Sequence, residues 1–284
     1  MKEKYIPIIQ KIANDVRKSK GLDNGTIIGD YIFTVLQQEC VVMMRPLRHQ
    51  PDLDGFSTEK IIKGELKTVV FINTAKSVEK QNFCAAHELG HRYKIDRLIQ
   101  DEFPDDIILP SDTEEIMNRF AAELMMSERD FIKRSNEIWY ERGTYNDSRR
   151  FQITVKECIQ TIIELMDFYY MPYKAVLYRM AEVGRISEDN RDYLEKFGNG
   201  NKSVVDKIIS DMGITRLRTP DYKIQNSISV NKKKEILENS QITKYLTDKE
   251  LAQYSKNLGL SRESTMLVRE LRKIETEMLD ISEK

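Results

Sequence analysis

Residues 87–91 read His-Glu-Leu-Gly-His, and this short motif restricts the fold more than any other part of the 284-residue chain. It falls inside residues 78–93, whose residue types predict a helix that begins after Ser77. Side chains four residues apart on a helix share one face about 6 Å apart, so the two imidazoles can bind one metal ion. Glu88 lies about 100° further round the helix, beside the metal rather than on it, as a general base would. Two of the three histidines in the sequence are in this motif, which favours a zinc site.

A catalytic zinc site needs three protein ligands and one open position, so a further ligand must lie outside the motif. The extended motif with a third histidine six residues downstream is excluded, because Arg97 occupies that position. His49 lies in a predicted loop, and Cys40 is more typical of a buried strand residue than of a ligand. A carboxylate therefore remains the best choice.

Glu114 is that candidate carboxylate, at the start of the next predicted helix. Glu114 and Asn118 are four residues apart on one helical face, and the alanines at 121 and 122 allow close approach to the helix with the two histidines. We predict zinc ligation by His87, His91 and Glu114. The Asn118 amide oxygen is expected to accept the free ring N–H of a ligand histidine.

The pattern of apolar residues predicts an α+β fold, a small mixed sheet with several helices. Strands are predicted over residues 40–44 and 66–72. Helices are predicted over residues 6–20, 27–39, 78–93, 114–126, 155–169 and 172–183. We expect residues 68–72 to form the edge of the sheet, along which an extended substrate adds as a further strand.

Charge and composition exclude several functional classes. The chain has 45 lysines and arginines against 46 aspartates and glutamates, so no basic surplus attracts a nucleic-acid backbone or an anionic membrane. Its three cysteines are irregularly spaced, which predicts free thiols in a reducing compartment. The longest apolar runs fall far short of the ~18 residues that span a membrane. We therefore expect no membrane contact and no direct nucleic-acid binding.

These segments resemble the ImmA/IrrE family of metallopeptidases. That family joins a helix similar to FTLAHELGH to a helix similar to ExxANxFAAxLLMP, and residues 83–91 and 114–127 here read FCAAHELGH and EEIMNRFAAELMMS. The departures leave every predicted ligand unchanged. The similarity also takes in residues 54–56 and 72–73, and more loosely 172–187, so it covers roughly residues 5–187.

The resemblance implies a small zincin-like metallopeptidase domain in which His87, His91 and Glu114 hold zinc and Glu88 is the general base. It implies a cytoplasmic zinc-dependent endopeptidase of bacterial or phage origin. Its protein substrate would be a regulatory protein such as a helix-turn-helix transcriptional repressor, whose cleavage induces genes of a mobile element or a stress response.

Two questions stay open at this point. A zinc-containing regulator that binds and sequesters a transcription factor without cleaving it is the alternative function, although the intact Glu88 argues against it. The group that stabilises the oxyanion is also open, with Tyr93, Tyr178 and Arg179 as candidates.

Composition becomes more polar after residue 186, which predicts two domains: a metallopeptidase domain over 1–187 and a mainly helical extension of unknown role over 188–284. Residues 251–271 resemble a helix-turn-helix, but their spacing is too long and their net charge too small for DNA binding. Apolar residues spaced four and three apart over 267–281 predict either docking onto the core or a homo-oligomer contact.

Overall fold

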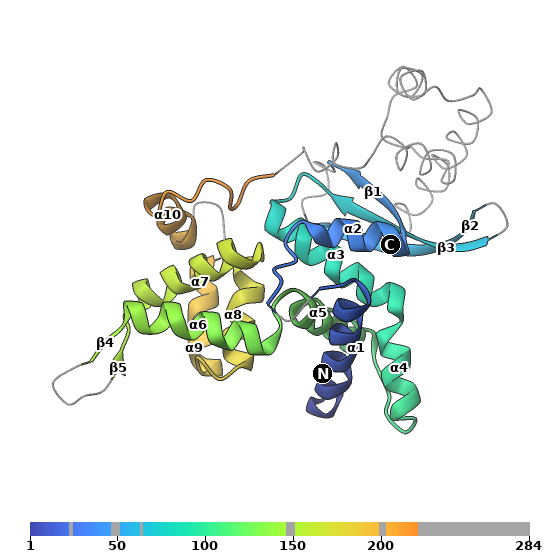
Figure 1. Ribbon diagram of the computed structural model, residues 1–284, viewed down its shortest axis with the longest axis horizontal. Coiled ribbons are helices and arrows are strands. Elements are labelled where there is room, and N and C mark those ends of the chain that lie inside the picture. Colours follow the sequence, from blue (N-terminus) through green and yellow to red (C-terminus); the bar gives the residue numbers. More distant parts are fainter. Residues whose placement is uncertain (23–24, 47–51, 63–64, 146–150, 199–202, 221–284) are drawn as a thin grey trace, which may run out of the picture.

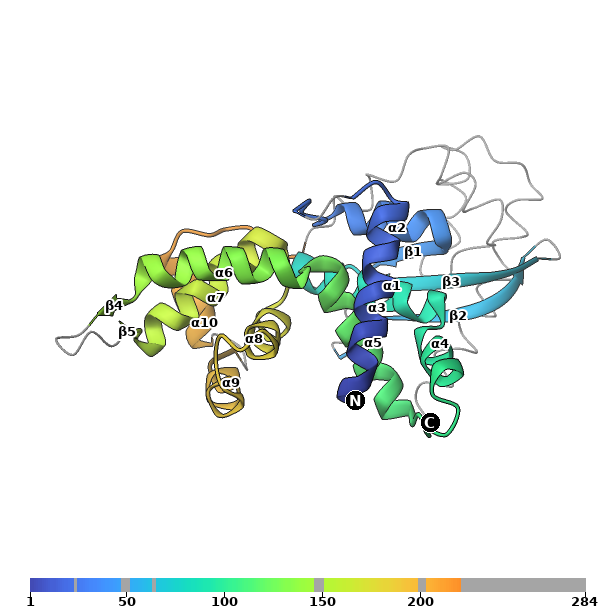
Figure 2. The same ribbon diagram turned by 60° about the horizontal axis from the view of Figure 1, so that its bottom comes forward.

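The computed structural model describes residues 1–22, 25–46, 52–62, 65–145, 151–198 and 203–220. Over these ranges the chain is α+β, as predicted, with helices outnumbering strands (Figure 1). Two groups of elements lie side by side, the sheet with the first five α-helices and a second, mainly helical group (Figures 1 and 2). No helix in the described ranges is both long and apolar enough to cross a membrane.

The first group carries the predicted site. Its elements are η1 (Glu3–Tyr5), α1 (Ile6–Ser19), α2 (Tyr31–Glu39), β1 (Val41–Arg45), β2 (Gly55–Ile62), β3 (Glu65–Asn73), α3 (Val78–Tyr93), α4 (Ile95–Glu102) and α5 (Pro110–Met125). The second group contains α6 (Glu128–Arg142), β4 (Thr144–Tyr145), β5 (Phe151–Gln152), α7 (Val155–Tyr169), α8 (Tyr173–Glu182), α9 (Glu188–Glu195), η2 (Lys196–Gly198) and α10 (Val204–Asp211).

The main sheet has the strand order β1-β3-β2. Strand β1 pairs with β3 in parallel, Val41 opposite Val69, and β2 pairs with β3 antiparallel, Gly55 opposite Ile72. The prediction that residues 68–72 form the sheet edge is therefore wrong, because β3 is the central strand. The edges are β1 and β2, and β2 was not predicted at all because its polar, half-exposed residues lack the alternation of a half-buried strand.

Helix α3 coincides with the helix predicted over residues 78–93, and Ser77 is its N-cap residue. Helix α5 begins at Pro110, four residues before the predicted start at Glu114. The fixed φ of proline suits the first turn of a helix, and the Asp112 carboxylate accepts a hydrogen bond from the Leu109 backbone N–H at 3.2 Å.

Close approach of α3 to α5 depends on Gly90. A Cβ atom at that position would lie 2.8 Å from the Met117 sulfur and 3.1 Å from a ring carbon of Phe120, so a larger residue would require these side chains to move. The glycine between the two motif histidines thus lets side chains of α5 pack directly against the backbone of α3.

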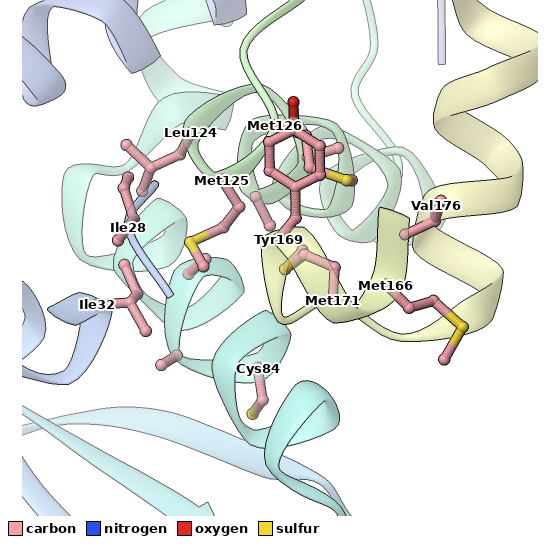
Figure 3. Packing of buried hydrophobic residues seen from close by; sticks show 14 of the residues in the cluster. Ile28, Ile32, Cys84, Leu124, Met125, Met126, Met166, Tyr169, Met171 and Val176 are labelled. Carbon is pink, nitrogen blue, oxygen red and sulfur yellow. The ribbon is translucent and has the colours of Figure 1, made fainter. Parts of the chain in front are cut away.

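One hydrophobic cluster joins the two groups of elements. Figure 3 shows Met125 and Met126, from the end of α5, in this cluster with Tyr169, Met171 and Val176 of the second group. All five side chains are buried. The second group is therefore packed onto the end of the helix that carries Glu114.

Residues beyond 187 also contribute to this packing. Leu194 of α9 and Val205 of α10 are buried, and the Val78 backbone N–H, in the first turn of α3, donates a hydrogen bond to the Thr219 carbonyl at 3.1 Å. The division into domains at residue 187 stays a prediction. The segments predicted at 251–271 and 267–281 lie outside the described residues.

Candidate active site

Helices α3 and α5 bring the three predicted ligands together. The Nε2 atoms of His87 and His91 are 3.1 Å apart, and the Glu114 carboxylate oxygens lie 3.1 Å from His87 Nε2 and 3.6 Å from His91 Nε2. One ligand atom from each of the three side chains lies within 4.8 Å of the others. Glu114 thus lies on the face of α5 that meets the two histidines of α3.

The donor set fits a tetrahedrally coordinated metal ion. Zinc bonds of about 2.0–2.1 Å place neighbouring tetrahedral ligands roughly 3.3 Å apart, which is close to the three donor distances here. Two imidazole nitrogens and one carboxylate, with a fourth position left for water, form one of the known catalytic zinc sets. The same atoms could hold another divalent transition metal, because nitrogen and carboxylate donors do not select zinc alone.

Asn118 lies one turn after Glu114 and contacts the other ring nitrogen of His87. Its Oδ1 atom is 2.9 Å from His87 Nδ1, where it accepts a hydrogen bond if that nitrogen carries the proton. With Nδ1 as the protonated nitrogen, Nε2 of His87, which faces Glu114 and His91, would be the atom that binds the metal. The geometry is the one expected from the i, i+4 spacing of Glu114 and Asn118.

The ionisable groups of this cluster change one another's pKa values. Burial alone lowers the pKa of His87, but the hydrogen bond with Glu114 and the charges of Glu88 and Glu114 outweigh it, so the pKa is raised. Burial and the neighbouring His87 lower the pKa of His91. The hydrogen bond with His87 lowers the pKa of Glu114. Glu114 therefore stays ionised and His91 neutral, the forms in which both bind a metal.

Glu88 lies beside this cluster and is itself only 5% exposed. Burial raises its pKa, opposed by the charge of His87 and by a hydrogen bond with the Ser57 side chain. A carboxylate held dry and close to a metal position can accept a proton near neutral pH more readily than an exposed one. Ser57 is on β2, the edge strand, and no sequence signal singled it out.

The candidate oxyanion groups differ in what they contact. Arg179 is fully buried and binds Glu123, so it is not available to a substrate. The Tyr178 hydroxyl donates to Glu195 at 3.0 Å. Burial and the carboxylate of Glu39 raise the pKa of Tyr93 to about 12.

Of the two alternative ligands, Cys40 is not part of the cluster that the described residues form. Burial raises the pKa of the Cys40 thiol to about 12, which disfavours the thiolate that binds metals. Cys40 is a free, buried cysteine, as are the other two. His49 lies outside the described residues.

A cleft of about 680 Å³ reaches the cluster at Asn118, although the three ligand candidates and Glu88 are not themselves part of its lining. Asn118, which contacts His87, is part of its lining, together with Phe83 of α3 and Ala122 of α5. The opposite wall is formed by α8 and α9, including Tyr178 and Arg191. The size is that of pockets which enclose several residues of a peptide or a drug-sized molecule.

A comparison with protein families identifies this arrangement. Residues 37–181 match the model of the peptidase family described as the IrrE N-terminal-like domain. The chain belongs to this family. The matched range contains the three ligand candidates, Glu88 and Ser57, and the family assigns the chain a metallopeptidase-type hydrolase function with protein as its substrate. No curated protein matches the chain significantly.

Proposed function

We propose that the protein is a zinc-dependent endopeptidase. The observation that carries this proposal is the convergence of His87, His91 and Glu114 with a buried carboxylate, Glu88, directly beside them. A site that only stored a metal would not need a buried acid-base group next to its ligands. When bound, zinc would polarise the scissile carbonyl and lower the pKa of the attacking water.

The chain's own residues have distinct tasks in this proposal. His87, His91 and Glu114 hold the ion, and Asn118 fixes the ring of His87 through its Nδ1 atom. Glu88 accepts the proton of the attacking water and passes it to the leaving amine nitrogen as the C–N bond breaks, which regenerates the Glu88 carboxylate.

An extended substrate is proposed to pair with β2. This strand has a hydrogen-bonded neighbour on one side only within the described part of the sheet, so its other edge can accept a further strand. Ser57 of β2 hydrogen-bonds Glu88, and a peptide that follows this strand therefore passes the catalytic carboxylate. The edge that guides the substrate is thus β2 rather than residues 68–72.

The proposed substrate is a regulatory protein of the cytoplasm, a helix-turn-helix transcriptional repressor whose loss induces genes of a mobile element or a stress response. Support comes from the resemblance to the ImmA/IrrE family. The alternative is sequestration of a transcription factor without cleavage, in which the zinc site would have a structural part only.

Incubation of the zinc-loaded protein with the repressor encoded nearest to its own gene tests the proposal. Mass spectrometry is expected to show two new fragments that together account for the repressor and that do not form in the presence of a chelator. A repressor that stays intact while it co-purifies with the zinc-loaded protein would instead support sequestration.

A further inference from the structure

The cleft beside the metal site has a charged lining whose positive groups are, with one exception, already paired. Lys174 lies 2.7 Å from Glu195, and Arg191 pairs with Glu188. Arg119 lies 3.2 Å from Glu182, and Arg218 lies 3.3 Å from Asp206. All four cations line the cleft, yet they offer little charge to a ligand, because each is already neutralised by a carboxylate.

Lys80 is the exception. It is half-buried in the cleft wall and has no ion pair among the residues that the structure describes. Asp54, another lining residue, is held by Lys76 at 2.5 Å, and the carboxylate of Glu79 accepts the Arg218 backbone N–H at 3.0 Å. Both carboxylates therefore already contact a group other than Lys80.

Lys80 lies in the first turn of its helix, where an unpaired positive charge is unfavourable. Lys80 is the third residue of α3, where the unpaired backbone N–H groups already give the helix end a positive potential. A lysine in this turn costs stability unless an anion compensates it. The positive end of the cleft therefore favours a negatively charged ligand.

Lys80 and the two histidines of the metal position lie on the same helix, α3. Lys80 precedes His87 by seven residues, about 10 Å along the helix axis, and Phe83 lies between them on the cleft side. An extended peptide covers about 10 Å in three residues. A peptide with its scissile bond at the metal therefore reaches Lys80 with a residue about three positions away.

We propose that Lys80 binds a carboxylate of the peptide substrate and so makes the enzyme selective for acidic peptides. The inference rests on the proposed peptidase function, of which it specifies the substrate class. The carboxylate can come from an internal glutamate or aspartate or from the free carboxyl terminus of the substrate. Lys80 contacts the ligand away from the reacting bond, so it sets specificity and takes no part in the proton transfer.

Binding measured apart from cleavage tests the proposal. The probes are fluorescent nine-residue peptides of neutral residues, blocked at both ends, with one glutamate moved through every position and glutamine counterparts as references. A further neutral peptide with a free carboxyl terminus separates the two sources of the carboxylate. Zinc-loaded protein carrying Glu88→Gln is used, so that bound peptides stay intact during anisotropy measurements.

We expect one glutamate position, or the free carboxyl terminus, to strengthen binding about three- to tenfold over its neutral reference. Lys80→Met is expected to abolish this preference, and Lys80→Glu to reverse it in favour of a lysine-containing peptide. Lys174→Met is the matched control, since Lys174 lines the same cleft but is already paired with Glu195, and it is expected to keep the preference.

The outcomes separate this inference from the function on which it rests. An acidic preference that survives Lys80→Met, or the absence of binding by every peptide, would overturn the role of Lys80. Hydrolysis of the same peptides by the protein with Glu88 intact is measured separately. Hydrolysis without a Lys80-dependent preference refutes only the specificity proposal, whereas a Lys80-dependent preference without hydrolysis supports Lys80 and counts against the peptidase.

Discussion

Arg179 of α8 and Glu123 of α5 form a two-point ion pair that is buried from solvent. The two guanidinium Nη atoms lie 2.8 and 2.6 Å from the two carboxylate oxygens, and Arg179 Nε donates to the Met126 carbonyl at 3.1 Å. Arg119 also binds Glu123, at 2.7 Å. Since α5 carries Glu114 and α8 forms a wall of the cleft, this pair fixes the metal-ligand helix against the cleft wall.

We predict that Glu123→Gln destabilises the protein by about 1.5–3 kcal/mol, because it leaves the buried Arg179 charge with Glu182, at 2.9 Å, as its remaining carboxylate partner. Urea unfolding followed by circular dichroism measures the change. Glu137→Gln, at the exposed pair of Arg134 and Glu137, is the control and is expected to cost less than about 1 kcal/mol. Equal effects of the two substitutions would show that the buried pair contributes no more to stability than the exposed pair.

The same pair predicts a pH dependence of stability. Burial tends to raise the pKa of Glu123, but the charges and hydrogen bonds of Arg179 and Arg119 outweigh it, so the folded-state pKa is lowered. A carboxylate with a lowered folded pKa contributes its stability above the unfolded pKa and loses it as the pH falls toward the folded value. The unsubstituted protein should therefore lose stability between pH 7 and pH 4. The free energy of unfolding of Glu123→Gln should change less over the same range.

We predict that the zinc content of the protein depends on the three ligand candidates. We expect one zinc ion per chain, lost in His87→Ala and His91→Ala and held much more weakly in Glu114→Ala, as measured by inductively coupled plasma mass spectrometry after dialysis. Glu115→Ala is the control, because Glu115 lies next to Glu114 but outside the cluster. Retention of full zinc affinity by Glu114→Ala would refute the ligand assignment.

Asn118→Leu should weaken zinc binding about 10–100-fold while the fold is retained, since it removes the acceptor that orients His87 but no ligand. Competition with a chromophoric chelator gives the affinity. Asn118→Asp restores an acceptor at the same place and is expected to bind zinc at least as well as the asparagine form. An unchanged affinity in Asn118→Leu would mean that the contact with His87 does not support the site.

Helical spacing in the sequence predicted which residues of the candidate site lie close together. His87, His91, Glu114 and Asn118 lie on two helices, where residue intervals translate directly into shared faces. Ser57 was missed because its role depends on the register of an edge strand with no recognisable pattern, and register is set by tertiary pairing.

The sequence makes Arg179 a candidate oxyanion group, whereas its buried ion pair with Glu123 gives it a structural role. Sequence separation hid this pair, because the two residues are 56 positions apart and on different helices. A charge of this kind can be classified only when its burial and its partner are known. The lack of an ion pair at Lys80 within the described part of the chain is likewise visible only in the structure, since it depends on what each neighbouring acid already binds.

Glu88→Gln distinguishes cleavage from sequestration. The substitution keeps the size of the side chain but removes its basicity, so zinc content and circular dichroism should stay unchanged while hydrolysis falls at least ~10²–10⁴-fold. A reporter of the repressed promoter gives the second measurement. Loss of induction in Glu88→Gln supports proteolysis, and induction equal to that of the unsubstituted protein would favour sequestration.

Two truncations test the proposed division of the chain. Every ligand candidate precedes residue 187, so a chain that ends there should still bind zinc. It also loses α9 and α10, with the buried side chains of Leu194 and Val205, and we expect it to be less stable by roughly 3 kcal/mol or more. A chain that ends at residue 220 keeps this packing and the contact between Val78 and Thr219, so it should be more stable than the chain that ends at residue 187. Loss of zinc in the shorter chain alone would show that residues 188–220 belong to the metallopeptidase domain.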